Sequence, residues 1–297
     1  MDALFVGQTY IDITLITDEL PTGDDKTVAD QFAVSFGGNA VTAAFCCAKL
    51  GVKTDLLATV ADDWLGHMFV DMARRYKVSL HSRKVQNSSL SFIIPKDGQR
   101  AIVRCRDARF LHPFPPLSLD GCRAIHLDGH QADAAIHFAR AGREAGILTS
   151  LDGGGMRENT IELLKFIDVA VVAERLCEQM NFEPHEMLNF LKSRGCAVGA
   201  VTRGEKGVIW YERGSGIKTM PALDIPRERV IDTNGAGDIF HGAYIYSALA
   251  SPEATWEDHF RFARAASAHA IQHLGNEASL PTLAEVTDVL STIRARA

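Results

Sequence analysis

One short segment of the chain, Asp232–Ala243 (D-T-N-G-A-G-D-I-F-H-G-A), combines small residues, a carboxylate and the start of an apolar helical pattern. Small side chains at Gly235, Ala236 and Gly237 would leave the N–H groups of a helix start free to bind an anion. Asp238 is the next residue in the chain. Its carboxylate would repel a bound phosphate unless its role is to accept a proton from a group beside that phosphate. The pattern therefore indicates a general base at a phosphoryl-transfer site. A glycine-rich helix cap whose first-turn Asp satisfies the helix dipole remains the alternative.

Alternating β-rich runs and helical patterns would position this segment. The predicted strands are Ala3–Gly7, Lys53–Val60, Ala124–Asp128, Leu148–Asp152, Val169–Val172, Ala197–Thr202 and Gly207–Tyr211. The predicted helices are Asn39–Leu50, Trp64–Tyr76, Ala132–Ala145 and Asn159–Phe166. Such alternation predicts an α/β fold with βαβ units and a mostly parallel sheet. A strand-like approach, Arg229–Ile231, precedes the glycine segment, and the helix after it is expected to end near Ala250.

Two stretches, Ile11–Phe36 and Ser88–Arg106, break this rhythm because they alternate apolar with polar residues. In the second stretch, Asp97-Gly98 between two β-rich runs is a strong hairpin signal. We expect antiparallel strands here, forming a small sheet outside the main domain. The chain has no long linker and no internal repeat, so residues 1–297 are predicted to form a single domain.

Composition excludes several classes of protein. The 31 Lys and Arg against 37 Asp and Glu give a net charge of −6, which argues against a general nucleic-acid or membrane-surface binder. No apolar run approaches the roughly 20 residues of a membrane helix. Asp2 without a basic segment argues against a secretory signal. Six scattered cysteines without a C-x-x-C pair are predicted to be apolar fillers of a reducing cytoplasm, and no P-loop or protein-kinase motif set occurs.

Four blocks together resemble the ribokinase (PfkB) family of carbohydrate kinases. Asp232–Phe240 is similar to the family's C-terminal signature, D-T-x-G-A-G-D-x-F. The other blocks are Gly7–Asp12, the Gly37-Gly38 pair followed by Leu50-Gly51, and Val201–Gly207, which resembles the T-x-G-x-x-G nucleotide loop. The resemblance implies a three-layer αβα sandwich whose lid comprises about residues 11–36 and 88–106. It also implies ATP with Mg²⁺ and transfer of the γ-phosphate to a sugar hydroxyl.

The resemblance also implies roles for individual residues. Asp238 matches the catalytic base, and the backbone of residues 235–237 matches the anion hole. The matching substrate positions are Asp12, Gly37, Gly38, Asn39 and Thr42. The matching nucleotide positions are Thr202, Gly204, Gly207, Gly235 and Gly237, with Arg203, Glu174 and His269 as further candidates. The positions that would bind a monovalent cation such as K⁺ are Asp232, Asn234, Gly275 and Ser279.

The chain departs from the family pattern at two places. Thr42 stands where the family often has Asn, so contacts to sugar hydroxyls should differ. The family's N-x-x-E motif is replaced by Ala173-Glu174-Arg175-Leu176, which makes Glu174 the candidate to order phosphate or Mg²⁺-bound water. These features and F-H-G-A resemble sulfofructose kinases more than ribokinase itself. His130, however, stands where such an enzyme supplies Arg, which argues against that substrate.

The acceptor pocket is predicted from charge. Arg104 and Arg106 alternate on one strand and share a face, and Lys26 could converge with them over an anionic sugar derivative. Asp128 and His130 end a strand where open α/β sheets place ligands. A solvated lid face with Asp24, Asp25 and Asp107 as counter-charges is the alternative. Exposed lid edges also suggest a homodimer.

Three functional alternatives stay open. The acceptor could be a nucleoside, or the protein could be a non-catalytic sugar or nucleotide sensor on the same fold. His269 and His273, four apart on a predicted helix, could bind a metal, although packing in the protein or an adenine pocket is the simpler interpretation. Asp152-Gly153-Gly154-Gly155 either lines the cleft or forms a tight turn. Cys46 and Cys47 are predicted to lie in the core.

Overall fold

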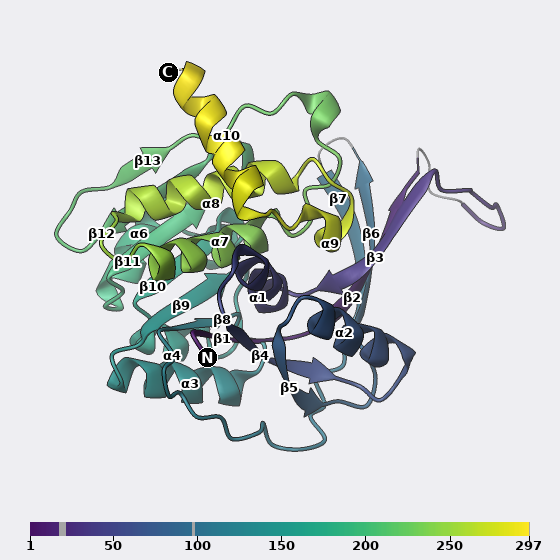
Figure 1. Cartoon of the computed structure of the whole chain (residues 1–297), viewed down its shortest axis with the longest axis horizontal. Coiled ribbons are helices and arrows are strands. Elements are labelled where there is room, and N and C mark those ends of the chain that lie inside the picture. Colours follow the sequence, from purple (N-terminus) through teal and green to yellow (C-terminus); the bar gives the residue numbers. More distant parts are fainter. Residues whose placement is uncertain (18–21, 97–98, 297) are drawn as a thin grey trace.

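The computed structural model describes residues 1–17, 22–96 and 99–296, and a nine-stranded sheet forms its centre (Figure 1). The strands are β1 (Ala3–Gly7), β4 (Thr54–Val60), β5 (Ser79–Lys84), β8 (Ala124–Leu127), β9 (Leu148–Gly153), β10 (Val169–Ala173), β11 (Val198–Thr202), β12 (Val208–Glu212) and β13 (Lys218–Met220). Their order is β13-β12-β11-β10-β9-β8-β1-β4-β5. The strands from β5 to β11 run parallel, and β12 and β13 pair antiparallel at one edge.

Helices cover both faces of this sheet (Figure 1). One hydrophobic core is lined by α1 (Asn39–Leu50), α2 (Trp64–Arg75), α7 (Ala236–Ala250), α8 (Trp256–Ala270) and α10 (Leu283–Arg296). The other is lined by α3 (Ala132–Glu144), α4 (Thr160–Leu163), α5 (Glu174–Met180) and α6 (Pro184–Ser193). Every residue of β1 and β4 is buried, as expected for parallel strands covered on both sides. The predicted three-layer α/β sandwich is confirmed.

The segment before α7 differs from the prediction. A strand was expected at Arg229–Ile231, but the chain forms a short 3₁₀ turn over Arg227–Arg229 and then continues without pairing as a strand. The backbone N–H of Ile231 donates to the carbonyl of Ile271 at the end of α8. The apolar residues of this approach therefore reflect packing against a helix end. The helix itself ends at Ala250, as predicted.

A second sheet of four strands forms the lid. Its strands are β2 (Tyr10–Ile16), β3 (Gln31–Gly37), β6 (Leu90–Lys96) and β7 (Gln99–Cys105), in the order β3-β2-β6-β7. The β2–β3 and β6–β7 pairs are antiparallel, as predicted, but β2 and β6 pair in parallel, which was not predicted. The reason is that the chain passes through α1, β4, α2 and β5 before it returns as β6. The predicted turn at Asp97-Gly98 lies outside the described residues.

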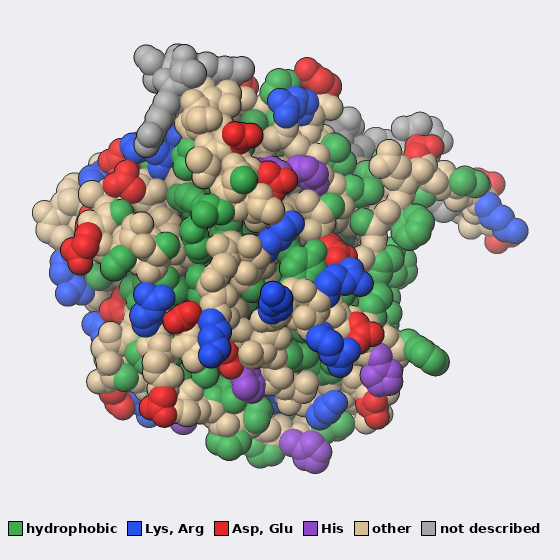
Figure 2. Space-filling model, viewed as in Figure 1, with side chains coloured by type: hydrophobic (Ala, Val, Ile, Leu, Met, Phe, Trp, Pro, Cys, Tyr) green, Lys and Arg blue, Asp and Glu red, His purple; other side chains and the backbone are tan. Residues whose placement is uncertain are grey.

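The two faces of the lid sheet have different chemistry. Asp12 pairs in register with Ser91, and Ser91 with Arg104, so these three polar residues share one face. The opposite face includes large apolar side chains that are exposed, among them Phe32 (71%) and Val103 (70%). In Figure 2, hydrophobic side chains gather toward the right, where the lid strands lie in Figure 1.

Two further sequence predictions can be checked against burial and helix length. Five of the six cysteines, including Cys46 and Cys47, are buried as predicted, but Cys105 is exposed at the end of β7. It lies on a solvated lid strand, so it is not the apolar filler that was expected. Within the described ranges, no helix combines the length and apolarity needed to cross a membrane.

Candidate active site

The start of α7 has an open backbone next to a carboxylate. Gly235 adopts a left-handed conformation (φ 72°) as the N-cap, and a Cβ there would lie 2.2 Å from Oδ1 of Asn276. At Gly237, by contrast, a Cβ would meet nothing within 4 Å, so the space beside this first turn is open. Asp238 lies in the same turn and is partly exposed. An anion could therefore approach the N–H groups of this helix start beside the carboxylate.

Asp12, predicted to bind substrate, lies on the inner face of the lid and is buried. Its Oδ2 accepts hydrogen bonds from the side-chain amides of Asn234 and Asn276, each at 3.1 Å. Its Oδ1 has no hydrogen-bond partner among the described residues. Burial raises the pKa of this carboxyl, and the nearby hydroxyl of Ser91 together with the two amide donors opposes that shift. A Cβ at Gly37 would lie 2.3 Å from the carboxylate, which explains the need for glycine there.

Asn276 is a site residue that sequence reasoning missed. Besides holding Asp12, its side-chain amide donates to the carbonyl of Phe36, and its backbone N–H donates to Oγ of Ser35. It thereby joins α9 (Gly275–Ser279) to the lid. One signal in the sequence could have identified Asn276: it directly follows Gly275, which was itself a predicted site residue.

The four residues predicted to bind a monovalent cation are partly brought together. Asp232 accepts the backbone N–H of Asn234 at 2.8 Å through Oδ1 and that of Gly275 at 3.2 Å through Oδ2. The hydroxyl of Ser279 donates to the carbonyl of Gly275 at 2.8 Å. The side chain of Asn234, however, is directed to Asp12. The backbone around Asp232 thus joins the start of α7 to α9.

The glycine pair before α1 lies directly beneath this region. Gly38 (φ 104°) packs so closely that a Cβ would lie 2.0 Å from the carbonyl oxygen of Gln8. Asn39 begins α1 and donates its side-chain amide to Oδ2 of Asp152 at 3.0 Å. Thr42 is fully buried, its hydroxyl has no described partner, and its Cγ2 lies 3.6 Å from where a Cβ on Gly235 would be.

The carboxylate of Asp128 holds three backbone segments in place. Its carboxylate accepts backbone N–H groups from Gln8 (3.2 Å), Ala40 (3.4 Å) and His130 (2.9 Å). A Cβ at Gly7 would lie 2.3 Å from Oδ2. Asp128 therefore fixes the ends of β1 and β8 relative to α1, which uses most of the hydrogen-bonding capacity that a sugar would need.

Basic side chains gather around Tyr10 and His130. The guanidinium of Arg104 lies 5.0 Å from the centre of the Tyr10 ring, and that ring is 6.4 Å from the ring of His130. Burial lowers the pKa of His130 to about 4, and the positive charges of Arg157, Arg106 and Arg104 act in the same direction.

Arg157 was missed because no motif surrounds it in the sequence. Its Nε donates to the carbonyl of Asp128 at 2.7 Å, so it is held beside the end of β8. Lys26, the predicted third cation, lies exposed on the connection between β2 and β3. The structure therefore joins Arg157, in place of Lys26, to the predicted arginine pair.

The predicted nucleotide loop lies at the carboxyl ends of β10 and β11. The backbone N–H of Arg203 donates to the carbonyl of Gly207 at 2.8 Å, which closes the loop around Gly204. Gly207 has φ 80°, and a Cβ there would lie 2.1 Å from the carbonyl of Met220. Thr202 donates its hydroxyl to the carbonyl of Val172 at 3.3 Å. Glu174, at the start of α5, accepts from Nζ of Lys206 in the loop at 3.1 Å.

His269 lies in the last turn of α8, close to the start of α7. Two residues earlier, the hydroxyl of Ser267 donates to the carbonyl of Ala236 at 2.8 Å. The rings of His269 and His273 lie 4.4 Å apart. The expectation that both are on one helix was wrong, since α8 ends at Ala270 and His273 follows in a turn.

Comparison with known proteins identifies this arrangement. The family model "pfkB family carbohydrate kinase" matches residues 2–283. The chain belongs to this family. It is therefore a carbohydrate kinase, a phosphotransferase that uses ATP. A ribokinase from Lactococcus lactis subsp. lactis is 24% identical over 295 residues, which cover 95% of this chain and 94% of that protein.

Solved structures agree with the predicted fold. The crystal structure of a putative ribokinase from Agrobacterium tumefaciens has a TM-score of 0.89 at 23% identity and covers 100% of this chain and 99% of that one. The Arabidopsis thaliana ribokinase complexed with ribose and ATP has a TM-score of 0.79 at 25% identity, covering 97% and 98%. The carbohydrate kinase thus has the predicted ribokinase-like fold.

Proposed function

We propose that this kinase transfers the γ-phosphate of ATP to a hydroxyl of a sugar derivative, with Asp238 as the general base. The supporting observation is the start of α7, where the space beside Gly237 is open and Asp238 lies in the same turn. In the reaction, an acceptor oxygen attacks the γ-phosphorus while the bond to ADP breaks, and Asp238 takes the hydroxyl proton. The N–H groups of residues 235–237 stabilise the charge on the transferring group.

Asp12 would orient the acceptor. Its Oδ1 is buried without a described partner, and an unpaired buried carboxylate oxygen is costly unless a ligand hydroxyl donates to it. Asn234 and Asn276 hold the carboxylate from the other side, so it is fixed before the sugar arrives. Such preorganisation contributes to rate by fixing the angle of attack.

ATP would lie along the loop from Thr202 to Gly207, with His269 on the side of α8. Mg²⁺ prefers oxygen ligands and usually binds through phosphates, a few carboxylates and water. Glu174, at the start of α5 beside this loop, is the carboxylate that fits such a role. A bound Mg²⁺ would neutralise negative charge on the phosphates. We assign a monovalent cation such as K⁺ to the loops joined by Asp232, because they offer backbone and side-chain oxygens near the start of α7.

The base is tested by Asp238→Asn, which keeps the shape and removes the proton acceptor. We expect the turnover number to fall by about 10²–10⁴-fold with ATP binding retained. Asp258→Asn is the matched control, because Asp258 also occupies the first turn of a helix, where it forms a capping box with Thr255. If both substitutions leave turnover near normal, Asp238 is only a cap and the proposal fails. A panel that includes nucleosides decides the acceptor class, and no turnover on any acceptor would favour a sensor.

We further propose that the acceptor is anionic, bearing a carboxylate, sulfonate or phosphate. Arg104, Arg106 and Arg157 all act on His130, opposed by the carboxylate of Asp128. Without a further anion, three guanidiniums near one imidazole and a single carboxylate would repel one another. Asp107 does not neutralise them, because its carboxylate is paired with Arg109 and also accepts the backbone N–H of Asn87.

Arg104→Ala tests the anionic acceptor. We expect KM for an anionic sugar to rise at least tenfold while KM for its neutral analogue changes little. Lys26→Ala, which removes an exposed lid cation, is the control and should affect both sugars equally. Equal effects of Arg104→Ala on the two sugars would exclude the anionic acceptor but leave the kinase assignment intact.

A further inference from the structure

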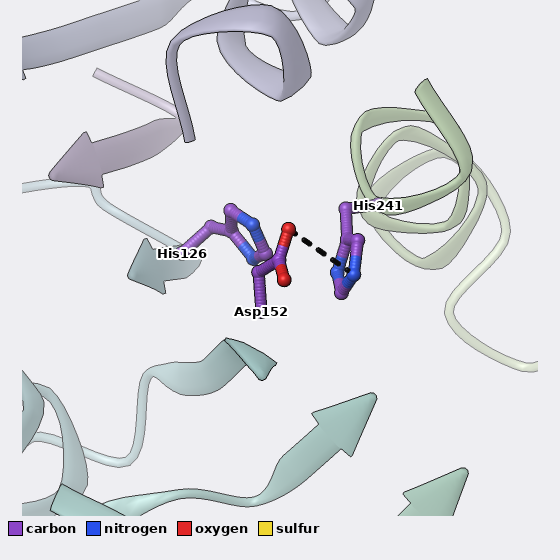
Figure 3. Close-up of side chains that lie close together, drawn as sticks. All are labelled: His126, Asp152 and His241. Carbon is purple, nitrogen blue, oxygen red and sulfur yellow. Dashed lines mark ion pairs between the residues drawn. The ribbon is translucent and has the colours of Figure 1, made fainter. Parts of the chain in front are cut away.

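Three side chains that the phosphoryl-transfer proposal does not use meet beneath the active site. His126 comes from β8, Asp152 from β9 and His241 from α7, and all three are buried. Figure 3 shows Asp152 between the two imidazole rings. One potential ligand atom from each residue lies within 4.8 Å of the others. Oδ2 of Asp152 and Nε2 of His241 are 3.4 Å apart.

The two imidazoles are oriented alike by hydroxyl groups. Nδ1 of His126 is hydrogen-bonded to Oγ of Ser150 at 2.9 Å, and Nδ1 of His241 to the hydroxyl of Tyr244 at 3.0 Å. The hydroxyls of Ser150 and Tyr244 are bonded to each other. Both rings therefore have Nδ1 engaged, which leaves Nε2 as the nitrogen available on each. Metal-binding histidines are usually held in this way through their other ring nitrogen.

One of these nitrogens lacks a partner in the protein. His126 is 0% exposed, and its Nε2 has no hydrogen-bond partner among the described residues. A buried polar atom of this kind needs an explanation, and a bound ion would supply one. Asp152 is likewise a buried carboxylate. It contacts the neutral amide of Asn39, the imidazole of His241 and the backbone N–H of Gly154, and the guanidinium of Arg157 acts on it from further away. Buried carboxylates are normally paired with a cation.

We propose that His126, Asp152 and His241 bind a divalent transition-metal ion of the Zn²⁺ class. Two imidazole nitrogens and one carboxylate oxygen suit Zn²⁺ or Co²⁺, whereas Mg²⁺ prefers oxygen ligands only. Bonds of about 2.0–2.1 Å in a tetrahedral arrangement place ligand atoms about 3.4 Å apart, as Oδ2 of Asp152 and Nε2 of His241 already are. The ligand atom of His126 lies within 4.8 Å of the other two, so His126 would complete the site by moving toward this pair.

The ion would fix the parts of the active site relative to one another. His241 lies three residues after Asp238 on the same helix, so it anchors the turn that carries the proposed base. Asp152 also accepts the amide of Asn39, at the start of α1 and next to Gly38. A metal bound here would join α7, α1 and the central sheet, and it would act as a positioning element separate from the Mg²⁺ that accompanies ATP.

The proposal is tested by metal retention and spectroscopy on the whole protein. A Cys105→Ser background removes the exposed thiol. After treatment with a chelator, exposure to Zn²⁺ and gel filtration, we expect about one Zn²⁺ per chain by mass spectrometry and a higher melting temperature. The Co²⁺ form should show visible absorption of a nitrogen and oxygen ligand set without a thiolate band. If the protein retains no metal and its melting temperature does not change, the proposal is overturned. This measurement decides the question without any ligand variant.

Variants assign the metal to these residues. His241→Gln and His126→Gln should abolish Co²⁺ absorption, and Ser150→Ala should weaken metal affinity about 10–100-fold, as loss of an orienting partner does. His81→Gln is the matched control, because His81 forms a comparable pair with Asp55 at 2.7 Å elsewhere in the sheet. If His241→Gln folds and binds Co²⁺ like the parent protein, or if His269→Gln removes the signal instead, the assignment is wrong.

Discussion

The central sheet is covered on both faces, whereas the lid sheet has one exposed face. All residues of β1 and β4 are buried, and helices pack on both faces. In the lid, β3 begins with exposed residues and ends with buried ones, where it reaches the main domain. One lid face holds Asp12 over the site, while the other exposes Phe32 and Val103. The central sheet can therefore act as a rigid platform, whereas the lid has an apolar surface without a described covering.

The largest effect expected from this contrast is on stability. Phe45 of α1 is fully buried and stacks on Phe36 with ring centres 3.9 Å apart. Phe45→Ala should lower the free energy of unfolding by about 3–5 kcal/mol, because it leaves a cavity in a packed core. Phe32→Ala in the lid removes an equal side chain that is 71% exposed and should cost the monomer under about 1 kcal/mol. Urea denaturation of both variants measures the difference, and equal losses would contradict the contrast.

The second prediction concerns the outer face of the lid. We expect it to pair with the same face of another copy, because a contiguous exposed apolar surface on a sheet favours association. The double variant Phe32→Ser with Val103→Ser should weaken a homodimer at least tenfold, or about 1.4 kcal/mol, in sedimentation equilibrium. Trp64→Ser is the control, since Trp64 is apolar and 89% exposed but lies on α2. A parent protein that stays monomeric at high concentration would exclude the lid dimer.

The smallest effect on the free energy of unfolding is expected for a substitution where the lid joins the main domain. Asp107 accepts the backbone N–H of Arg109 at 2.9 Å and that of Asn87 at 3.0 Å. These donors, the N–H of Arg109 first, lower the pKa of Asp107 to about 2. Because the folded-state pKa lies below the unfolded value, the carboxylate stabilises the fold above about pH 4, and this contribution is lost as pH falls toward 2.

Asp107→Asn should therefore cost on the order of 1 kcal/mol at neutral pH, the usual net contribution of one protein hydrogen bond. The difference from the parent protein should shrink as the pH falls from 4 to 2. Urea denaturation at several pH values measures it, with Asp71→Asn on the exposed face of α2 as the control. A difference that grows on acidification would show that Asp107 does not act through its charge.

Local residue patterns were sufficient for the elements and the catalytic segment. The helix Asn39–Leu50 was predicted with both ends correct, because Gly38 and Gly51 take backbone conformations that favour glycine at the two ends. The helix start at residues 235–238 was predicted because small residues before an apolar helical pattern indicate a helix start without any knowledge of distant contacts. The parallel β2–β6 pair could not be predicted locally, since its direction depends on where the chain returns after β5.

The sequence by itself determined the family, the α/β fold and the candidate base, because all of these depend on spacing along the chain. Only the tertiary structure placed Asn276 against Asp12, Arg157 and Arg104 around Tyr10, and His126 and Asp152 against His241 of α7. These residues are 264, 53 and up to 115 positions apart in the chain. Contacts of that kind depend on strand order and helix packing, which bring side chains together without leaving any periodic pattern in the sequence.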